Sequence, residues 1–282
     1  MNKRILPALI TLSLVAAACS PHLLQRTGPP VAGLPQAHAH NDYQHERPLL
    51  DALAHGFTSI EADIHLRNQQ LLVGHDPEEI SPDRTLQSLY LDPLQDRIKR
   101  NQGAVFEKDT RCFLFIDIKT DADSTYAALD PVLQRYRKML TEYRQHTRKQ
   151  RAVTIILSGN RPITRIKNQS KRWAAIDGRL DEQSFHESAE LMPIVSDKWE
   201  NHFSWRGQGL MPGSEQARLT GLIRLAHASG HLIRFWGTDV DSSRYQTDFW
   251  SLLHQAGVDL INTDKLEELQ TFLLQRQDKR SP

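Results

Sequence analysis

Short apolar runs alternate with stretches of helical periodicity along most of the chain. The runs that predict strands are 36–40, 58–64, 70–75, 112–119, 152–158, 172–177, 192–196, 231–237 and 258–263. Helical patterns occupy 47–56, 124–147, 214–230, 245–257 and 265–277. Three of these patterns run into Gly56, Gly230 or Gly257, where a glycine C-cap is favoured. Alternation of this kind predicts a parallel sheet with helical crossovers.

The number of strand–helix units favours a closed barrel. About eight such units in roughly 250 residues is the usual size of a (β/α)8 barrel. An open, doubly wound sheet is the alternative, but the chain has no GxGxxG turn to support it. We therefore expect an α/β protein with a (β/α)8 TIM-type barrel, formed as a single domain by residues 36–278.

The first 18 residues have the pattern of a targeting segment outside the fold. The basic MNKR precedes an apolar stretch, ILPALITLSLVAAA, that is too short to span a membrane. Small residues lead to Cys19 in VAAACS, which is similar to a bacterial lipoprotein signal, although Ala16 stands where Leu is usual. Cleavage near Ala18 by ordinary signal peptidase is the alternative. We expect an exported protein with signal peptide 1–18 and tether 19–35, anchored in a cell-envelope membrane through lipidated Cys19, or otherwise periplasmic or secreted.

Composition and charge exclude several classes of protein. Hydrophobic residues make up 39% and charged residues 24% of the chain, as in an ordinary globular protein. The formal net charge of +1 argues against an electrostatically driven nucleic-acid binder. The basic stretch 135–151 is interpreted as a solvated helix face, with a phosphate-binding patch as the alternative. Two cysteines are too few for a disulfide framework, and Cys112 is expected to be a small buried hydrophobe.

Polar residues at the strand ends are the candidates for chemistry. Glu61 and Asp63 lie two apart on one strand, so both point to the same face and repel each other unless a cation or proton lies between them. In a barrel the active site lies at the carboxyl ends of the strands. The polar residues at those ends are His38, His40, Glu61, Asp63, His75, Asp76, Asp117, Lys119, Asp239 and Asp264, together with Trp236. Alternatively, Glu61 and Asp63 face solvent on an edge strand, and Asp117 and Lys119 form a structural ion pair.

The segments AHND, PLLDALAHGFTSIEADI and LLVGHD resemble the opening of the PLC-like phosphodiesterase superfamily. That group includes glycerophosphodiester phosphodiesterases, phosphoinositide phospholipase C-like proteins and sphingomyelinase D-like toxins. FLFIDIKT, IRFWGTD and GVDLINTD are similar to later strands of the family and follow in the same order. The chain departs from most glycerophosphodiesterases at His40-Asn41-Asp42, where they carry His-Arg-Gly, and Asp117 matches the sphingomyelinase D-like branch instead.

The resemblance implies a phosphoric diester hydrolase that cleaves a glycerophosphodiester or a phospholipid-type diester. His40 and His75 would be acid and base, and Glu61, Asp63 and Asp117 would bind one Mg²⁺ or Ca²⁺. Substrate contacts would come from Lys119, Asn41 and Trp236, while Asp76 would orient His75. The partners would be a small phosphodiester or a phospholipid headgroup and, through the anchor, a membrane, but no nucleic acid. Loops 160–190 and 197–213 would form the leaving-group pocket.

Two other functions fit parts of the pattern. His38 and His40 would suit an amidohydrolase-type zinc hydrolase, completed by Asp264 and by His186 or His202. That alternative leaves Glu61, Asp63 and His75 without a role. A surface lipoprotein that uses the barrel only for binding is the non-enzymatic alternative. A requirement for Mg²⁺ or Ca²⁺, for Zn²⁺, or for no metal distinguishes the three.

Overall fold

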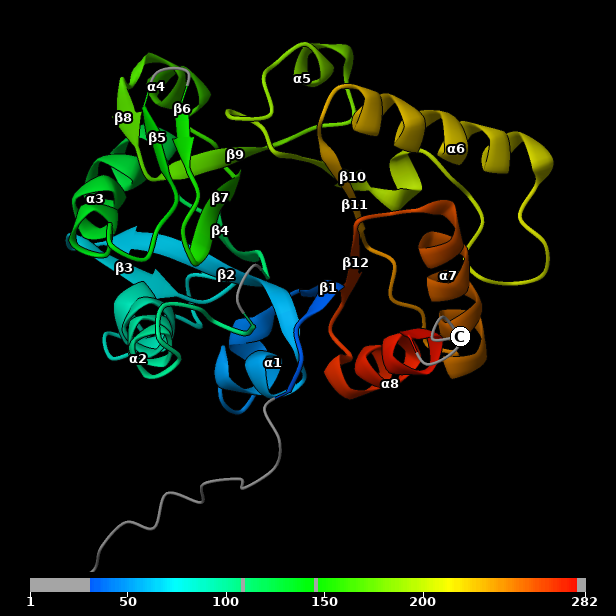
Figure 1. Cartoon of the computed structure of the whole chain (residues 1–282), viewed down its shortest axis with the longest axis horizontal. Coiled ribbons are helices and arrows are strands. Elements are labelled where there is room, and N and C mark those ends of the chain that lie inside the picture. The colour runs from blue at the N-terminus through cyan, green and yellow to red at the C-terminus, as the bar shows by residue number, and fades with distance from the viewer. Residues whose placement is uncertain (1–30, 108–109, 145–146, 278–282) are drawn as a thin grey trace, which may run out of the picture.

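The computed structural model describes residues 31–107, 110–144 and 147–277. In these residues, eight parallel strands pair in sequence and close into a barrel when the last strand pairs with the first (Figure 1). The barrel strands are β1 (Leu34–Ala39), β2 (Phe57–Arg67), β4 (Cys112–Ile118), β7 (Val153–Gly159), β9 (Ala174–Gly178), β10 (Ile194–Lys198), β11 (Leu232–Trp236) and β12 (Leu260–Thr263). The (β/α)8 barrel expected from the sequence is thereby confirmed.

The connecting helices cover the outside of the barrel (Figure 1). They are α1 (Leu50–Ala54), α2 (Asp92–Arg100), α3 (Ala122–Arg135), α4 (Ile163–Asn168), α5 (Glu182–Phe185), α6 (Gly213–Ala228), α7 (Ser243–Ala256) and α8 (Leu266–Gln277). Short 3-10 turns lie at Asp42–Gln44 and Trp199–Asn201, and a π-helical turn lies at Gln87–Leu91. The predicted glycine C-cap is clearest at α7, where Gly257 has a φ of 88°.

Alternation along the strands separates two environments inside the barrel. Inward positions in its lower part are apolar and form one cluster, made mainly by Phe113, Phe115, Ile156, Ala175, Ile194 and Leu260. Outward positions pack against the helices in a larger cluster. Toward the carboxyl ends the inward positions become polar, so the barrel has a dry floor and a polar mouth.

One predicted helix, at 124–147, is wrong beyond its first half. Helix α3 ends at Arg135, and the chain then forms β5 (Glu142–Arg144) and β6 (Thr147–Lys149), which make a small antiparallel sheet with β8 (Lys171–Arg172). Tyr143, which we had assigned to an amphipathic helix, is instead buried beneath the Arg172 guanidinium, 4.1 Å from its ring centroid. Tertiary packing of this aromatic ring therefore overrides the helical spacing.

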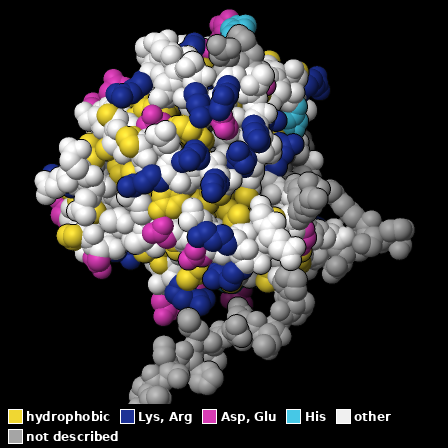
Figure 2. Space-filling model, turned by 60° about the vertical axis from the view of Figure 1, so that its left-hand side comes forward, with side chains coloured by type: hydrophobic (Ala, Val, Ile, Leu, Met, Phe, Trp, Pro, Cys, Tyr) yellow, Lys and Arg dark blue, Asp and Glu magenta, His cyan; other side chains and the backbone are white. Residues whose placement is uncertain are grey.

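The basic side chains of the 135–151 stretch are mostly solvent-exposed, as expected, but from turns and strands instead of one helix face. Figure 2 shows Lys and Arg side chains gathered on this side of the molecule. The exposed basic residues are Arg135, Arg137, Lys138, Arg144, Arg148 and Lys149.

Three further sequence predictions concern residues 70–75, Cys112 and the N-terminal segment. The run at 70–75 forms β3 (Gln70–Val73), an antiparallel return on β2. Cys112 is buried with a free thiol, as expected. The predicted signal peptide and Cys19 lie outside the described residues. Within the described ranges, the helices are too short or too polar for any of them to cross a membrane.

Candidate functional site

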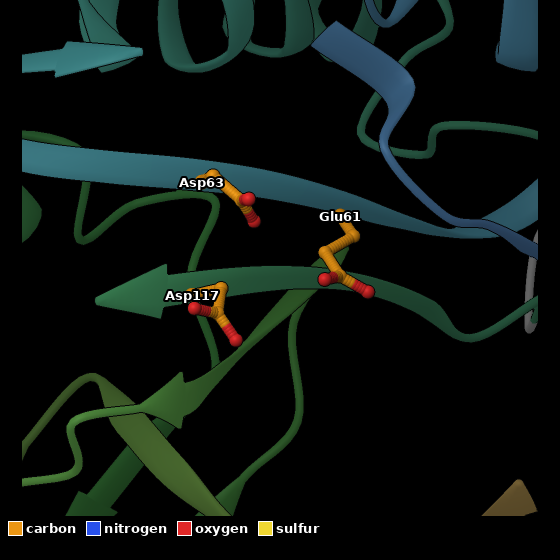
Figure 3. Close-up of side chains that lie close together, drawn as sticks. All are labelled: Glu61, Asp63 and Asp117. Atoms are coloured by element: carbon orange, nitrogen blue, oxygen red, sulfur yellow. The ribbon is translucent and has the colours of Figure 1, made fainter. Parts of the chain in front are cut away.

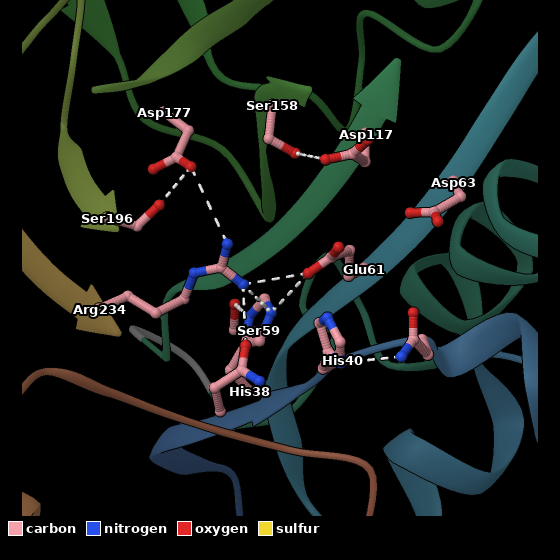
Figure 4. A network of polar contacts seen from close by, with 12 residues as sticks. His38, His40, Ser59, Glu61, Asp63, Asp117, Ser158, Asp177, Ser196 and Arg234 are labelled. Carbon is pink, nitrogen blue, oxygen red and sulfur yellow. Dashed lines mark hydrogen bonds and ion pairs between the residues drawn. The ribbon is translucent and has the colours of Figure 1, made fainter. Parts of the chain in front are cut away.

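A polar cavity of about 410 Å³ opens at the carboxyl ends of the barrel strands. Alternate residues of each strand point inward. At the carboxyl end of each barrel strand, the inward residue or the one that follows the strand is polar. The cavity is lined chiefly by His40, Glu61, His75, Asp117, Lys119, Ser158, Asn160, Asp177, Arg179, Arg234 and Trp236. Figure 4 shows six of these side chains converging from strands that are far apart in the sequence, namely His40, Glu61, Asp117, Ser158, Asp177 and Arg234.

Three carboxylates meet on one side of this cavity. Glu61 and Asp63 come from β2, and Asp117 comes from the neighbouring β4, where it is the register partner of Asp63. One oxygen of each lies within 4.8 Å of the others (Figure 3). Glu61 and Asp63 are buried and Asp117 is half-buried, so water screens their mutual repulsion poorly.

Asp63 is the most heavily engaged of the three. Its Oδ2 atom lies 2.9 Å from Tyr43 Oη, 2.8 Å from His75 Nδ1 and 2.9 Å from Lys119 Nζ. Its Oδ1 atom is buried and has no hydrogen-bond partner among the described residues. Burial and the charges of Glu61 and Asp117 raise the pKa of Asp63, against the opposing effect of Lys119.

Glu61 is held by a buried arginine. Arg234 Nη1 lies 3.0 Å from Glu61 Oε2 and 2.6 Å from His38 Nε2. Burial opposes ionisation of Glu61, but the hydrogen bond with His38 and the charge of Arg234 outweigh it and lower its pKa. Burial and the same guanidinium lower the pKa of His38 to about 3, so this imidazole is neutral at physiological pH.

His40 lies at the rim of the cavity next to Asp264. Its Nδ1 atom is 2.8 Å from Asp264 Oδ1, and Asn41 Nδ2 contacts the same oxygen at 3.3 Å. Burial alone would lower the pKa of His40, but the hydrogen bond with Asp264 and the charge of Glu61 raise it overall. Asp239 in turn accepts a hydrogen bond from the Asp264 backbone at 2.7 Å, which fixes the loop that carries this carboxylate.

His75 reaches the cavity from the loop after β3. We expected Asp76 to orient it, but the carboxylate at His75 Nδ1 is that of Asp63, and the Asp76 side chain is exposed. The two residues are adjacent in sequence, and beyond the end of β3 the chain turns, so their side chains diverge. The loop is held instead by Glu79, whose Oε2 atom accepts the backbone N–H of His75 at 2.8 Å.

The residues predicted to contact substrate have different surroundings. Lys119 Nζ lies 2.9 Å from Asp63 and 3.1 Å from Asp117. Lys119 therefore forms the ion pair with Asp117 that the sequence suggested, and it also lines the cavity. Trp236 is half-buried and lines the cavity. Asn41 contacts His40, Asp264 and Tyr43, and is therefore placed to orient His40.

The two loops predicted to form the leaving-group pocket behave differently. In the first loop, Asn160 and Arg179 line the cavity. In the second loop, the aromatic residues of 199–205 are buried, and Trp199 stacks on Phe203 and Phe249. Their role is packing, because the apolar rings gain more from burial beneath α7 than from a wet rim.

Several cavity residues were not found from the sequence. Arg234 and Asp177 are buried charges at inward strand positions, and each stands alone among apolar neighbours in LIRFW and AAID. A lone charge in such a strand is a usable signal. Tyr43 lies within the short 3-10 turn after β1, and Arg179 lies directly after β9, and neither offered such a pattern.

The zinc set of the alternative function is not assembled. His38 Nε2 lies 2.6 Å from Arg234 Nη1 and 3.0 Å from Glu61 Oε2, and its Nδ1 lies 2.7 Å from Ser59 Oγ, so both ring nitrogens have protein partners. The His186 side chain is 77% exposed, and His202 pairs with Asp197 at 2.9 Å. Among the described residues, Glu61, Asp63 and Asp117 are the group with the geometry to hold a metal ion.

These three carboxylates fit a hard divalent cation. The unpartnered Oδ1 of buried Asp63 faces like charges, and an oxygen-rich set is what Mg²⁺ and Ca²⁺ prefer. Lys119 and Arg234 compensate part of the negative charge but leave this oxygen without a partner.

Comparison with protein families gives one match. A model described as the AIM6-like phosphodiesterase domain covers residues 31–177. "Altered inheritance of mitochondria protein 6 homolog" of Arthroderma benhamiae is 27% identical, over 80% of this chain and 80% of that protein. "Altered inheritance of mitochondria protein 6" of Lachancea thermotolerans is 30% identical, over 84% of this chain and 65% of its own length.

Two solved structures share the fold at low sequence identity. A calcium-dependent phosphoinositol-specific phospholipase C from Pseudomonas superposes with a TM-score of 0.52 and 13% identity, covering 82% of this chain and 88% of that one. Phosphatidylinositol-specific phospholipase C from Listeria monocytogenes also gives 0.52, with 10% identity and coverages of 88% and 96%. The barrel is therefore of the PLC-like type.

Proposed function

Because the chain belongs to the AIM6-like phosphodiesterase family, we propose that it is a metal-dependent phosphoric diester hydrolase that uses two histidines as acid and base. One observation carries this proposal. His40 and His75 both line the cavity that Glu61 and Asp117 also line, and each has a carboxylate at its Nδ1 atom. With Nδ1 engaged, Nε2 of each ring is the atom available to exchange a proton with substrate.

Each of these residues has a different role in the proposed cleavage of the diester. One imidazole removes a proton from the attacking water or substrate hydroxyl, and the other protonates the leaving oxygen. Lys119 contributes positive charge next to the phosphoryl group. Glu61, Asp63 and Asp117 would hold the Mg²⁺ or Ca²⁺, which when bound supplies neutralisation of the phosphoryl oxygens.

The substrate class proposed is a glycerophosphodiester or a phospholipid-type diester. The names of the two structural neighbours support this class, since one is a phosphoinositol-specific and the other a phosphatidylinositol-specific phospholipase C. The open, polar cavity supports it as well, because it suits a hydrophilic headgroup better than an acyl chain.

A substrate and metal screen tests the proposal. The protein without residues 1–18 is incubated with glycerophosphodiesters, lysophospholipids, phosphoinositides and bis(4-nitrophenyl) phosphate, each with Mg²⁺, Ca²⁺ or EDTA. We expect turnover of at least one diester with a divalent cation and none in EDTA. The same cation should raise the melting temperature of wild type but not of Asp117→Asn, while the exposed control Asp248→Asn keeps the response. Activity that survives EDTA and Asp117→Asn would refute the metal-dependent reaction.

A further inference from the structure

The polar mouth of the barrel is divided by charge. The three carboxylates lie on β2 and β4, whereas the inward positions at the ends of β9, β10 and β11 carry Arg179, Lys198 and Arg234. Inward orientation follows from alternation, since Ala175 and Ile194 of the same strands lie in the barrel interior. The half of the mouth across from the carboxylates is therefore basic.

The buried carboxylate of Asp177 lies close to two of these cations, Arg179 and Arg234. Asp177 lies 3.1 Å from Arg179 and 3.9 Å from Arg234, and its backbone carbonyl accepts from Arg161 Nη1 at 2.5 Å (Figure 4 labels Asp177 and Arg234). Arg234 is also paired with Glu61, and the Asp177 carboxylate pairs with Arg179, while the negative charges of Asp177, Asp181 and Asp117 all act on Arg161. Burial has the largest effect on the pKa of Arg161 and lowers it, and the positive charge of Arg179 lowers it further. The two guanidinium groups are therefore close enough to repel each other.

Lys198 extends this positive charge toward the rim. Its Nζ atom lies 5.8 Å from the ring centroid of Trp236, which lines the cavity. Glu200 balances Lys198 at 2.8 Å, but the same glutamate also pairs with Arg206 at 2.8 Å. Near the cavity rim, one carboxylate is therefore shared between Lys198 and Arg206.

We infer that Arg179, with Lys198 and Arg161, forms a subsite for a second anionic group of the substrate, separate from the phosphate that is cleaved. The substrate is then a phosphodiester whose retained alcohol carries a phosphomonoester or a carboxylate. Two adjacent guanidinium groups and an ammonium suit such an anion, because arginine binds phosphate and carboxylate oxygens in a forked geometry. This inference rests on the proposed diesterase function and narrows its substrate.

Three matched substrates test the subsite by catalysis. They are 4-nitrophenyl glyceryl phosphate, its analogue with a phosphomonoester on the glycerol, and 4-nitrophenyl 2-carboxyethyl phosphate. We expect Arg179→Gln to lower kcat/KM for an analogue with a second anion by about 10- to 100-fold, and to change kcat/KM for the glyceryl diester, whose glycerol carries no anionic group, by less than about threefold. The two anionic analogues show whether phosphate or carboxylate is preferred. Equal losses on all three substrates would overturn the subsite.

A binding measurement keeps the test independent of turnover. Inorganic phosphate is titrated calorimetrically into protein in EDTA, where the carboxylate half of the mouth repels the anion. We expect Arg179→Gln to weaken phosphate binding at least about tenfold and Lys198→Gln by a smaller factor. Arg148→Gln, which removes the same charge from exposed β6, is the control and should bind like wild type.

The outcomes separate the subsite from the reaction. Phosphate binding that depends on Arg179 in a protein with no diesterase activity would retain the subsite and reject the reaction. Diesterase activity without any preference for a second anion, or phosphate binding that ignores Arg179 and Lys198, would reject the subsite alone. If Arg179→Gln does not fold, Lys198→Gln decides, because its side chain is 40% exposed and its replacement leaves no buried charge unpaired.

Discussion

At the scale of single residues, His40 and His75 are held by two different carboxylates, Asp264 and Asp63. Since neither histidine belongs to the carboxylate group that we propose to bind the cation, replacing either with Ala should lower turnover by about 10²–10⁴-fold while the affinity for the cation survives. The double variant should be little worse than the poorer single one, because both act on one transition state. Diester turnover and calorimetric cation titration measure the two effects. Intact activity in His75→Ala would exclude it as acid or base.

A second residue-scale prediction concerns the buried Asp42, which follows His40 in the loop after β1. Its Oδ2 atom accepts the backbone N–H of Leu49 at 2.5 Å, and its Oδ1 atom has no partner among the described residues. Burial raises the pKa of Asp42 to about 7, so the folded protein retains a proton that the unfolded chain loses near pH 4. Its stabilising contribution is therefore present below about pH 4 and is lost as pH rises through about 7.

Replacement of Asp42 by Asn removes this dependence. Between pH 5 and 8 the unfolding free energy of wild type should fall, relative to that of Asp42→Asn, by about 2–4 kcal/mol. Urea unfolding at several pH values measures the difference. The exposed control Asp248→Asn should follow wild type throughout, and parallel curves for Asp42→Asn and wild type would contradict an abnormal Asp42.

At the scale of elements, the end of β7 supports the carboxylate of β4. Gly159 ends β7 with a φ of +67°, and a Cβ atom added there would lie 2.4 Å from Asp117 Oδ1 and 2.6 Å from the Ile118 carbonyl oxygen. Gly159→Ala must therefore displace Asp117 in addition to straining the backbone. We expect at least a tenfold loss of cation affinity, by calorimetry, and a lower melting temperature.

Gly209 provides the matched control for the Gly159→Ala substitution. It has the same φ of +67°, but no atom lies within 4 Å of an added Cβ. Gly209→Ala should cost about 1 kcal/mol of stability from backbone strain alone and leave cation affinity unchanged. Equal effects of the two substitutions on cation affinity would show that the β7–β4 contact does not position Asp117.

At the scale of the whole molecule, the candidate site and the start of β1 lie at opposite ends of the barrel. The cavity lies at the carboxyl ends of the strands, whereas the chain enters β1 from the opposite end (Figure 1). We propose that Cys19 is lipidated and anchors the protein to a membrane. Wild type should fractionate with membranes and incorporate labelled palmitate, and Cys19→Ser should do neither. A mature N-terminus other than Cys19 on a soluble protein would point to ordinary secretion.

The features of this structure that depend on neighbouring residues could be predicted from the sequence. Period-two alternation is a property of the extended backbone, so the strands and the shared face of Glu61 and Asp63 could be predicted from neighbouring residues alone. The barrel class followed from the number of strand–helix units along the chain. The assignment of His40, His75 and the three carboxylates as site residues stays a prediction, although the structure brings all five to one cavity or its carboxylate cluster.

What only the tertiary structure decided involves partners that are distant in sequence. The register of β2 on β4 sets Asp63 beside Asp117, and closure of the barrel brings Asp264 to His40 across 224 positions. The Arg234–Glu61 pair spans 173 positions, and the basic half of the mouth exists only because β9, β10 and β11 end side by side. Local periodicity carries no record of which strands become neighbours. Strand pairing and the burial of rings such as Tyr143 decide that, through free energies that belong to the folded chain as a whole.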